Sequence, residues 1–346
     1  MTIEKEKIKR ILLIKFGGIG DVILFTPVLY NIREYFPNSE ITVFIEKKAY
    51  EVIKDNPYID KYITVKFNGK ISPSIYKEIK KKKYDLVLDF YGNPRTALIT
   101  YFSKAKYRAG FNFRIRKFAY NIVTKIESSK LHNLEFNLKL LEELNIPIKS
   151  KEIYIHTDEI HRKTAENWFN SNILNKKNII GIVISGGWNS KIYPEKDYIE
   201  LLNLINKKYI VEFVFFWGNE EEMQRSRLIK NGLNENCHIA PELNLKTLAE
   251  FYKYCTLLIG NDSGPLHLAV TSKNPVLEIS GPINPLLQGP YGEQNEYVYL
   301  EGLDCLFCNL LECPIGNKCM KDLPKNKIIE KFEKLLSKNN IKLDLR

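Results

Sequence analysis

The chain has no long apolar run. No part of its 346 residues approaches the ~20 consecutive apolar residues that a helix needs to cross a bilayer. Its first ten residues carry acidic side chains ahead of a strand-like run, unlike a signal peptide. We therefore expect a soluble, cytoplasmic protein without a transmembrane segment. Hydrophobic residues make up 44% of the chain, enough for two cores, because single cores usually stop growing near ~250 to 300 residues.

Two common nucleotide-binding fingerprints are also missing. The run GGIGD at residues 17–21 follows the first strand-like segment, but Ile23 stands where a dinucleotide-binding loop has its third glycine. No P-loop Gly-Lys-Ser/Thr sequence occurs anywhere in the chain. These absences argue against an NAD-dependent enzyme and against a P-loop ATPase.

Acidic residues are absent from residues 90–126, where basic and aromatic side chains alternate. Residues 1–150 hold 28 Lys and Arg against 16 Asp and Glu, whereas the remainder holds 24 against 25, so the first half carries the net charge of +11. Such a surface attracts phosphate or anionic lipid headgroups. The alternative is general lysine enrichment of the sequence. We expect no nucleic-acid partner, because RRM, KH, zinc-finger and helix-turn-helix patterns are absent.

Short β-branched runs alternate with amphipathic segments, which predicts a doubly wound α/β architecture of two Rossmann-like domains. We expect domains over residues 1–160 and 175–322, then a helix and tail over 323–346. The predicted strands are 10–16, 41–46, 84–90, 179–185, 210–216, 256–260 and 275–280. The predicted helices are 21–36, 72–83, 133–145, 158–173, 195–207, 219–230, 245–254, 263–272 and 325–338.

The loops that follow the strands should carry the chemistry, because ligands in open α/β sheets bind beyond the carboxyl ends of the strands. Two such domains facing each other would make a central cleft. In the loop at 17–21, glycines let the backbone approach a ligand at a helix N-terminus. Asp21 is either the N-cap of that helix or a general base that accepts a proton from an attacking hydroxyl.

A second motif, GNDSGPLHLA at residues 260–269, also follows an apolar strand and opens a helix, which predicts an anion site. Asp262 is suited to cap this helix, and the N–H groups of Ser263 and Gly264 can face a diphosphate. His267, one turn further on, can donate a hydrogen bond to a phosphate oxygen of the leaving group. A structural histidine is the alternative.

Two further loops complete the candidate set. In SGGWNSKIYP at residues 185–194, Gly186 and Gly187 bring backbone close to a ligand, and Lys191 can neutralise phosphate. The alternative is one more surface lysine. The loop WGNEEE at residues 217–222 can place a carboxylate against ribose hydroxyls, although acidic first turns are common in ordinary helices.

Together these motifs resemble the ADP-heptose:lipopolysaccharide heptosyltransferase family, glycosyltransferase family 9, over nearly the whole chain. The most specific are GGIGDVILFTPVLYNIREYFPNSEITVFI and GNDSGPLHLAVTSKNPVLEISGPINPLLQGPYG. The resemblance implies Asp21 as catalytic base and a donor site of Gly186, Gly187, Lys191, Glu220, Asp262, Ser263, Gly264 and His267. For the acceptor we predict contacts from Gly18, Gly20, Arg95, Arg114, Arg116 and Lys117.

The resemblance also implies a GT-B fold and an inverting reaction without a catalytic metal, which agrees with the lack of a DxD motif. The implied donor is ADP-heptose. The implied acceptor is an acidic glycolipid, the lipopolysaccharide inner core on lipid A, reached by peripheral association with the inner face of the cytoplasmic membrane. Alternatives are another nucleotide-sugar donor, a protein acceptor, and a non-catalytic protein that binds polyanions or anionic lipid.

Four of the six cysteines form a C-x2-C-x4-C-x5-C cluster: Cys305, Cys308, Cys313 and Cys319. Disulfides are rare in cytosolic proteins, and four thiolates can hold zinc or iron in a closed structural site. The alternative is a set of reduced thiols without metal. Cys237 and Cys255 lie in or beside apolar segments and are expected to be buried.

Overall fold

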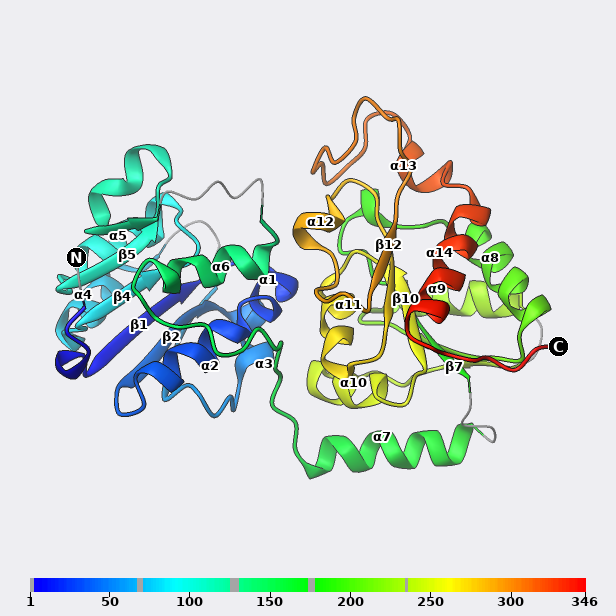
Figure 1. Cartoon of the computed structure of the whole chain (residues 1–346), viewed down its shortest axis with the longest axis horizontal. Coiled ribbons are helices and arrows are strands. Elements are labelled where there is room, and N and C mark those ends of the chain that lie inside the picture. Colours follow the sequence, from blue (N-terminus) through cyan, green and yellow to red (C-terminus); the bar gives the residue numbers. More distant parts are fainter. Residues whose placement is uncertain (1–2, 67–70, 125–130, 174–177, 234–235) are drawn as a thin grey trace. The chain divides into compact units, whose positions relative to one another are not determined.

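The computed structural model describes residues 3–66, 71–124, 131–173, 178–233 and 236–346, without the side chains of residues 114 and 115. The chain divides into two compact units, residues 1–156 and 157–346. Each is built on a six-stranded parallel sheet (Figure 1). The strand order is β3-β2-β1-β4-β5-β6 in the first unit and β12-β11-β10-β7-β8-β9 in the second. Counted within each unit, both orders are 3-2-1-4-5-6, which confirms two Rossmann-like doubly wound sheets.

In the first unit the central strand is buried on both faces, since residues 11–14 of β1 are completely inaccessible to solvent. The strands are β1 (Arg10–Lys15), β2 (Glu40–Glu46), β3 (Lys61–Val65), β4 (Leu86–Asp89), β5 (Tyr107–Phe111) and β6 (Ile122–Thr124). The helices are α1 (Ile19–Ile23), α2 (Thr26–Tyr35), α3 (Tyr50–Ile53), α4 (Pro73–Lys82), α5 (Pro94–Phe102) and α6 (Asn133–Glu142). Short 3-10 turns are η1 (Lys5–Lys7), η2 (Lys47–Ala49) and η3 (Arg114–Ala119).

The second unit repeats this plan. Its strands are β7 (Ile179–Val183), β8 (Glu212–Phe216), β9 (Cys237–Ile239), β10 (Leu257–Asn261), β11 (Val276–Ile279) and β12 (Glu296–Val298). Its helices are α7 (Glu159–Asn172), α8 (Glu195–Lys208), α9 (Glu220–Asn231), α10 (Leu245–Tyr252), α11 (Gly264–Ala269), α12 (Pro285–Gln288), α13 (Lys318–Lys321) and α14 (Lys325–Lys338). The 3-10 turns η5 (Asn189–Lys191) and η6 (Val270–Ser272) complete it.

Helix α14 spans the predicted residues 325–338 and packs on β11, β12 and α8. It buries Ile328, Phe332, Leu335 and Leu336, whose spacing puts them on one helical face. Across the described residues, no helix combines the length and apolarity needed to cross a membrane.

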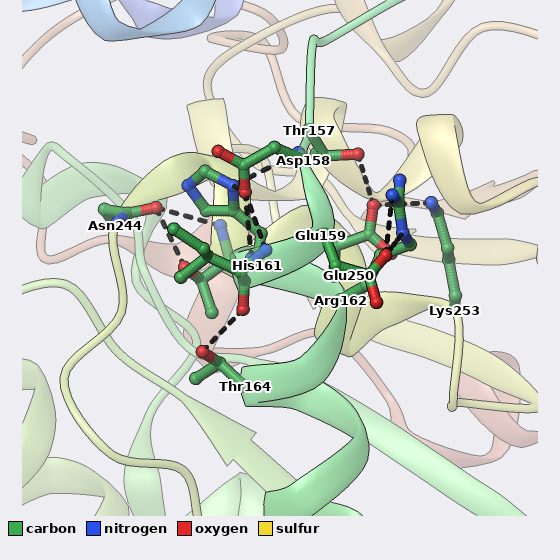
Figure 2. Close-up of polar contacts among 11 residues, drawn as sticks. Thr157, Asp158, Glu159, His161, Arg162, Thr164, Asn244, Glu250 and Lys253 are labelled. Carbon is green, nitrogen blue, oxygen red and sulfur yellow. Dashed lines mark hydrogen bonds and ion pairs between the residues drawn. The ribbon is translucent and has the colours of Figure 1, made fainter.

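Helix α7 opens the second unit and is fixed at its start (Figure 2). Asp158 is its N-cap and accepts hydrogen bonds from the backbone N–H groups of residues 160 and 161. The hydroxyl of Thr157 donates to the buried carboxylate of Glu250 on α10, which also pairs with Lys253 at 2.7 Å. These contacts hold the first turn of α7 against α10.

The structure differs from the predicted elements in several places, and helices α3, α5, α12 and α13 were not predicted. The expected helix 21–36 is two helices, because Pro27 lies in the first turn of α2 and has no N–H for a continuous ladder. Strands β3, β5, β6, β9 and β12 were not predicted, being short or interrupted by polar residues. The basic segment 90–126 is not one continuous surface, because β5 runs through it with Tyr107 and Phe111 each only 1% exposed.

Candidate active site

In the first unit the candidate site lies at the carboxyl end of β1, which pairs with β2 on one side and β4 on the other. This is the switch point of the sheet, where loops diverge and ligands usually bind. Gly17 follows β1 with a φ of +125°, and a Cβ there would lie 2.7 Å from Oδ2 of Asp21. Only glycine fits both the backbone angle and the close approach of that carboxylate.

Asp21 is half-buried in the first turn of α1, with both carboxylate oxygens held by hydrogen bonds. The backbone N–H of Gly18 donates to Oδ2 at 2.9 Å, and the amide of Asn133 on α6 donates to Oδ1 at 3.2 Å. The N-cap interpretation of Asp21 is wrong: Gly18 is the N-cap, and Asp21 is three residues further on. A carboxylate has about four lone-pair sites, so the two contacts orient Asp21 and leave capacity for another donor.

Two buried charged groups lie beneath this loop. The Lys15 ammonium donates to Asn137 at 3.1 Å; burial lowers the pKa of Lys15, and the charges of Asp21 and Asp89 act in the opposite direction. Burial raises the pKa of Asp89, although the backbone N–H of Gly92 and the hydroxyl of Tyr120 donate to its carboxylate at 2.9 and 2.8 Å. Neither Lys15 nor Asp89 was among the residues predicted for the site.

The predicted acceptor-binding residues are in different places. Arg116 donates to the backbone carbonyl of Gly92 at 2.5 Å, so it lies at the carboxyl end of β4, the same sheet edge as the Asp21 loop. Gly18 and Gly20 are in that loop and in α1. Lys117 is exposed on η3, and Arg95 is half-buried on α5. The side chain of Arg114 lies outside the described residues.

In the second unit, the loops after β7 and β10 bring Lys191, Asp262 and His267 together. Nζ of Lys191 lies 2.7 Å from Oδ2 of Asp262 and 4.2 Å from the ring centroid of Trp188. Nε2 of His267 lies 3.5 Å from Oδ1 of Asp262. Burial acts to raise the pKa of Asp262, but the hydrogen bond from His267 and the charge of Lys191 outweigh it, so that pKa is lowered.

One nitrogen of His267 is buried without a partner. Within the described residues, its Nδ1 has no hydrogen-bond partner. The side chain as a whole is only 6% exposed. The helix cap predicted for Asp262 is wrong, because Ser263 is the N-cap of α11 and accepts from the N–H of Leu266 at 3.3 Å. Gly264 is the first residue of α11.

The turn that carries Lys191 is held from several sides. Gly187 has a φ of +68°, and Gly186 packs against Ile192. The buried hydroxyl of Ser190 donates to the carbonyl of Leu310 at 2.6 Å. Buried Asn261 donates to the carbonyl of residue 184 at 2.9 Å and accepts from the N–H of residue 193 at 3.2 Å. Lys191 is therefore presented by a preformed turn.

Glu222, in the loop 217–222 predicted to place a carboxylate against ribose, faces the loop after β7. Oε2 of Glu222 accepts from the hydroxyl of Ser185 at 2.8 Å and from the N–H of Gly218 at 2.7 Å. Glu220, the predicted nucleoside ligand, is exposed and accepts from Gln224 at 2.6 Å. Asn219 is the N-cap of α9, so Glu222 occupies the third helical position, and its side chain reaches back to the N–H of Gly218, one residue before the cap. In the sequence, the spacing Asn-x-x-Glu from Asn219 to Glu222 is the pattern that could have indicated this position of Glu222.

Glu278 is a carboxylate that was not among the residues predicted for the site. It pairs in register with Gly260 of the anion loop and accepts from the hydroxyl of Ser280 at 2.5 Å. Burial, and then the charge of Asp262, raise the pKa of Glu278 well above its ordinary value. The negative charge of Asp262 thus disfavours ionisation of Glu278.

The four clustered cysteines line one small cavity together with Ser190, Gly281 and Pro282. Burial, followed by the three neighbouring thiols, raises the pKa of Cys319 to about 11, which keeps that thiol protonated. Within the described ranges, no group of three or more His, Cys, Asp or Glu side chains is placed to hold a metal ion. The predicted structural zinc or iron is therefore not supported. Cys237 and Cys255 are buried as predicted.

Two doubly wound Rossmann-like units in one chain are the architecture of the GT-B class of glycosyltransferases. The sequence model of "Glycosyltransferase family 9 (heptosyltransferase)" matches residues 73–318. The chain belongs to this family and is a glycosyltransferase.

Individual relatives agree with this assignment. Lipopolysaccharide heptosyltransferase 1 of Campylobacter coli is 29% identical over 291 residues, covering 79% of this chain and 84% of the relative. A family 9 glycosyltransferase structure from Veillonella parvula matches with a TM-score of 0.82 at 25% identity, covering 98% of this chain and 99% of that one. The Escherichia coli heptosyltransferase WaaC with ADP-2-deoxy-2-fluoro heptose matches with a TM-score of 0.64 at 18% identity, covering 94% and 99%.

Proposed function

We propose that the chain transfers heptose from ADP-heptose to the lipopolysaccharide inner core on lipid A, with inversion and without a catalytic metal. The observation that carries the proposal is the Lys191, Asp262 and His267 cluster at the carboxyl ends of β7 and β10. The names of the relatives support the choice of sugar and acceptor: one is a lipopolysaccharide heptosyltransferase, and another was solved with an ADP-heptose analogue.

The donor diphosphate is proposed to bind at the start of α11. Lys191 supplies a positive charge, Nδ1 of His267 a hydrogen-bonding atom, and the N–H groups of Ser263 and Gly264 the donors that a first helical turn leaves unpaired. We assign the ribose contact to Glu222, because its carboxylate is held facing Ser185, whereas Glu220 is exposed.

In the proposed reaction, the acceptor hydroxyl gives its proton to Asp21 as its oxygen attacks the anomeric carbon of the heptose. The bond between that carbon and the diphosphate oxygen breaks, and ADP leaves with the bonding electron pair. Lys191 and His267 stabilise the negative charge that develops on the diphosphate, the task that a metal ion performs in other transferases. The contacts from Gly18 and Asn133 orient Asp21 for proton acceptance.

The acceptor is proposed to be an acidic glycolipid at the inner face of the cytoplasmic membrane, where the chain associates peripherally. Arg116 is best placed to contact its phosphate or carboxylate groups, because it lies at the same sheet edge as the Asp21 loop. Arg95 and Lys117 remain predicted contacts. An arginine offers two parallel donors to such groups, which also orients the acceptor.

The test is Asp21→Asn, assayed with ADP-heptose and Kdo-lipid A. The variant keeps the shape of the side chain and cannot accept the proton, so transfer should fall by about 100- to 10,000-fold. ADP affinity, measured by calorimetry, should be unchanged and serves as the folding control. Turnover close to that of the parent would show that Asp21 is not the base. A parent chain that binds UDP or GDP in preference to ADP would overturn the donor assignment.

A further inference from the structure

The exposed hydrophobic side chains of the first unit are concentrated in one place. In the described part of that unit, every strongly exposed large hydrophobic side chain lies between residues 91 and 118. They are Tyr91, Leu98, Tyr101, Phe102 and Phe118, from 37% to 52% exposed. Scattered apolar residues are normal on a protein surface, but such a concentration usually marks an interaction site.

Four of these side chains, Leu98, Tyr101, Phe102 and Phe118, form what we call the aromatic ridge. The Tyr101 ring lies 5.5 Å from Phe102 and 5.7 Å from Phe118. Leu98, Tyr101 and Phe102 are spaced three and four residues apart, so they share one face of α5. The opposite face of α5, which carries Thr96, Ala97, Ile99 and Thr100, is the buried one, so the exposed ridge is a second largely apolar face, whereas a surface helix of a soluble protein normally has only one.

Lysines surround the ridge. Nζ of Lys104 lies 4.6 Å above the ring of Tyr101, and Lys117 is exposed next to Phe118. The Phe102 ring lies 5.9 Å from Tyr76 on α4, whose exposed residues include Lys77, Lys80 and Lys81 with one acid, Glu78. No acidic residue occurs in residues 90–126. The charged residue in contact with a ridge ring, Lys104, and the exposed charged residue adjoining Phe118 in the chain, Lys117, are both positive.

We propose that the aromatic ridge docks the chain on an anionic lipid bilayer. Its aromatic and leucine side chains enter the boundary between headgroups and acyl chains, while Lys104, Lys117 and the lysines of α4 contact lipid phosphates. Apolar side chains that include a tyrosine, with lysines beside them, suit the boundary between lipid headgroups and acyl chains. The inference deepens the proposed function, because a membrane glycolipid acceptor requires the enzyme to work at that surface.

The first experiment measures co-sedimentation of the full chain with vesicles of phosphatidylethanolamine and phosphatidylglycerol, and with phosphatidylcholine alone. The parent should prefer the anionic vesicles. Phe102→Ser combined with Phe118→Ser should weaken binding roughly tenfold, and each of Lys104→Gln and Lys117→Gln about fivefold at low salt only. The matched control is Ile160→Ser with Leu228→Ser, 74% and 61% exposed in the second unit, which should bind like the parent.

A second measurement reports insertion directly. All three native tryptophans lie in the second unit, so Phe118→Trp places a new probe in the ridge. Its emission should shift to the blue with anionic vesicles. The proposal would be overturned if the Phe102→Ser, Phe118→Ser variant bound vesicles as tightly as the parent, or if the parent bound both kinds of vesicle equally. Tighter binding to a polynucleotide than to vesicles would also overturn it.

Vesicle binding needs neither the sugar donor nor the acceptor, so the proposed docking surface and the proposed function can be refuted independently. A chain that transfers heptose to a detergent-dispersed acceptor but never binds vesicles refutes the docking surface alone. A chain that docks through the ridge and transfers nothing refutes the proposed function and leaves the surface standing.

Discussion

Replacing Lys191 with methionine separates its two roles, as ligand for a diphosphate and as partner of Asp262. Methionine keeps the length and apolar stem of lysine and removes the charge. The Lys191 side chain is only 12% exposed and Asp262 only 3%, so solvent cannot replace the lost ion pair. We expect a loss of both ADP affinity and stability.

The two losses can be sized separately. A hydrogen bond to a charged group contributes about 1.5 to 3 kcal/mol, so ADP should bind about 10- to 150-fold more weakly. Removing one partner of a buried ion pair costs about 3 to 5 kcal/mol. Asp262 keeps His267 at 3.5 Å, which favours the lower end of that range. A loss of about 3 kcal/mol lowers the Tm of a unit of this size by roughly 6 to 12 °C.

Calorimetric titration with ADP and with adenosine, below the Tm of the variant, distinguishes the roles. Adenosine has no phosphate, so its affinity should be unchanged while that of ADP falls. Lys196→Met is the matched control, because Lys196 is exposed on the neighbouring helix α8. A destabilised Lys191→Met chain that binds ADP like the parent would show that Lys191 only neutralises Asp262.

Three further predictions follow from the second unit. Ser190→Ala removes the 2.6 Å hydrogen bond that holds the Lys191 turn, so ADP affinity should fall about 2- to 10-fold by calorimetry; an unchanged affinity would contradict this role. Glu222→Gln should weaken adenosine binding about tenfold while Glu220→Gln leaves it unchanged, and the reverse order would restore the original assignment. Burial raises the pKa of Glu278 above its ordinary 4.5, so the folded chain keeps a proton that the unfolded chain releases, and stability falls as pH rises through that interval. Glu278→Gln should remove this fall, which denaturant unfolding between about pH 5 and pH 8 can measure.

The sequence predicts the fold wherever a residue pattern is long enough to be read. Central strands such as β1 and β7 are continuous apolar runs because both faces of a parallel sheet are covered. Helix α14 shows its buried face at helical spacing, and its predicted and observed bounds agree. The missed strands β6, β9 and β12 have three residues each, too short for any periodicity. Their place in the sheet depends on pairing with a neighbouring strand, which is a non-local property.

Candidate side chains could be predicted from the sequence where a single loop supplies them. Contacts between two elements could not be predicted. Lys191 and Asp262 could each be selected from their own loops, but their 2.7 Å contact exists only in the folded sheet. Lys15 lies in the predicted strand 10–16, and no neighbouring residue in the sequence indicates that its ammonium is buried near Asp89 and Asp21. The contact between Glu222 and Ser185 likewise joins two loops, so the sequence alone does not distinguish Glu222 from Glu220.

The two sheets have the same strand order, yet their switch points carry opposite charges. In the first unit a buried ammonium, Lys15, lies below the half-buried carboxylate of Asp21. In the second, the buried carboxylate of Asp262 lies behind the more accessible ammonium of Lys191. Both inner groups are buried; Lys15 donates to Asn137, whereas Asp262 pairs directly with Lys191. The proposed transfer assigns different roles to the two switch points, a proton acceptor to Asp21 and an anion-binding cation to Lys191.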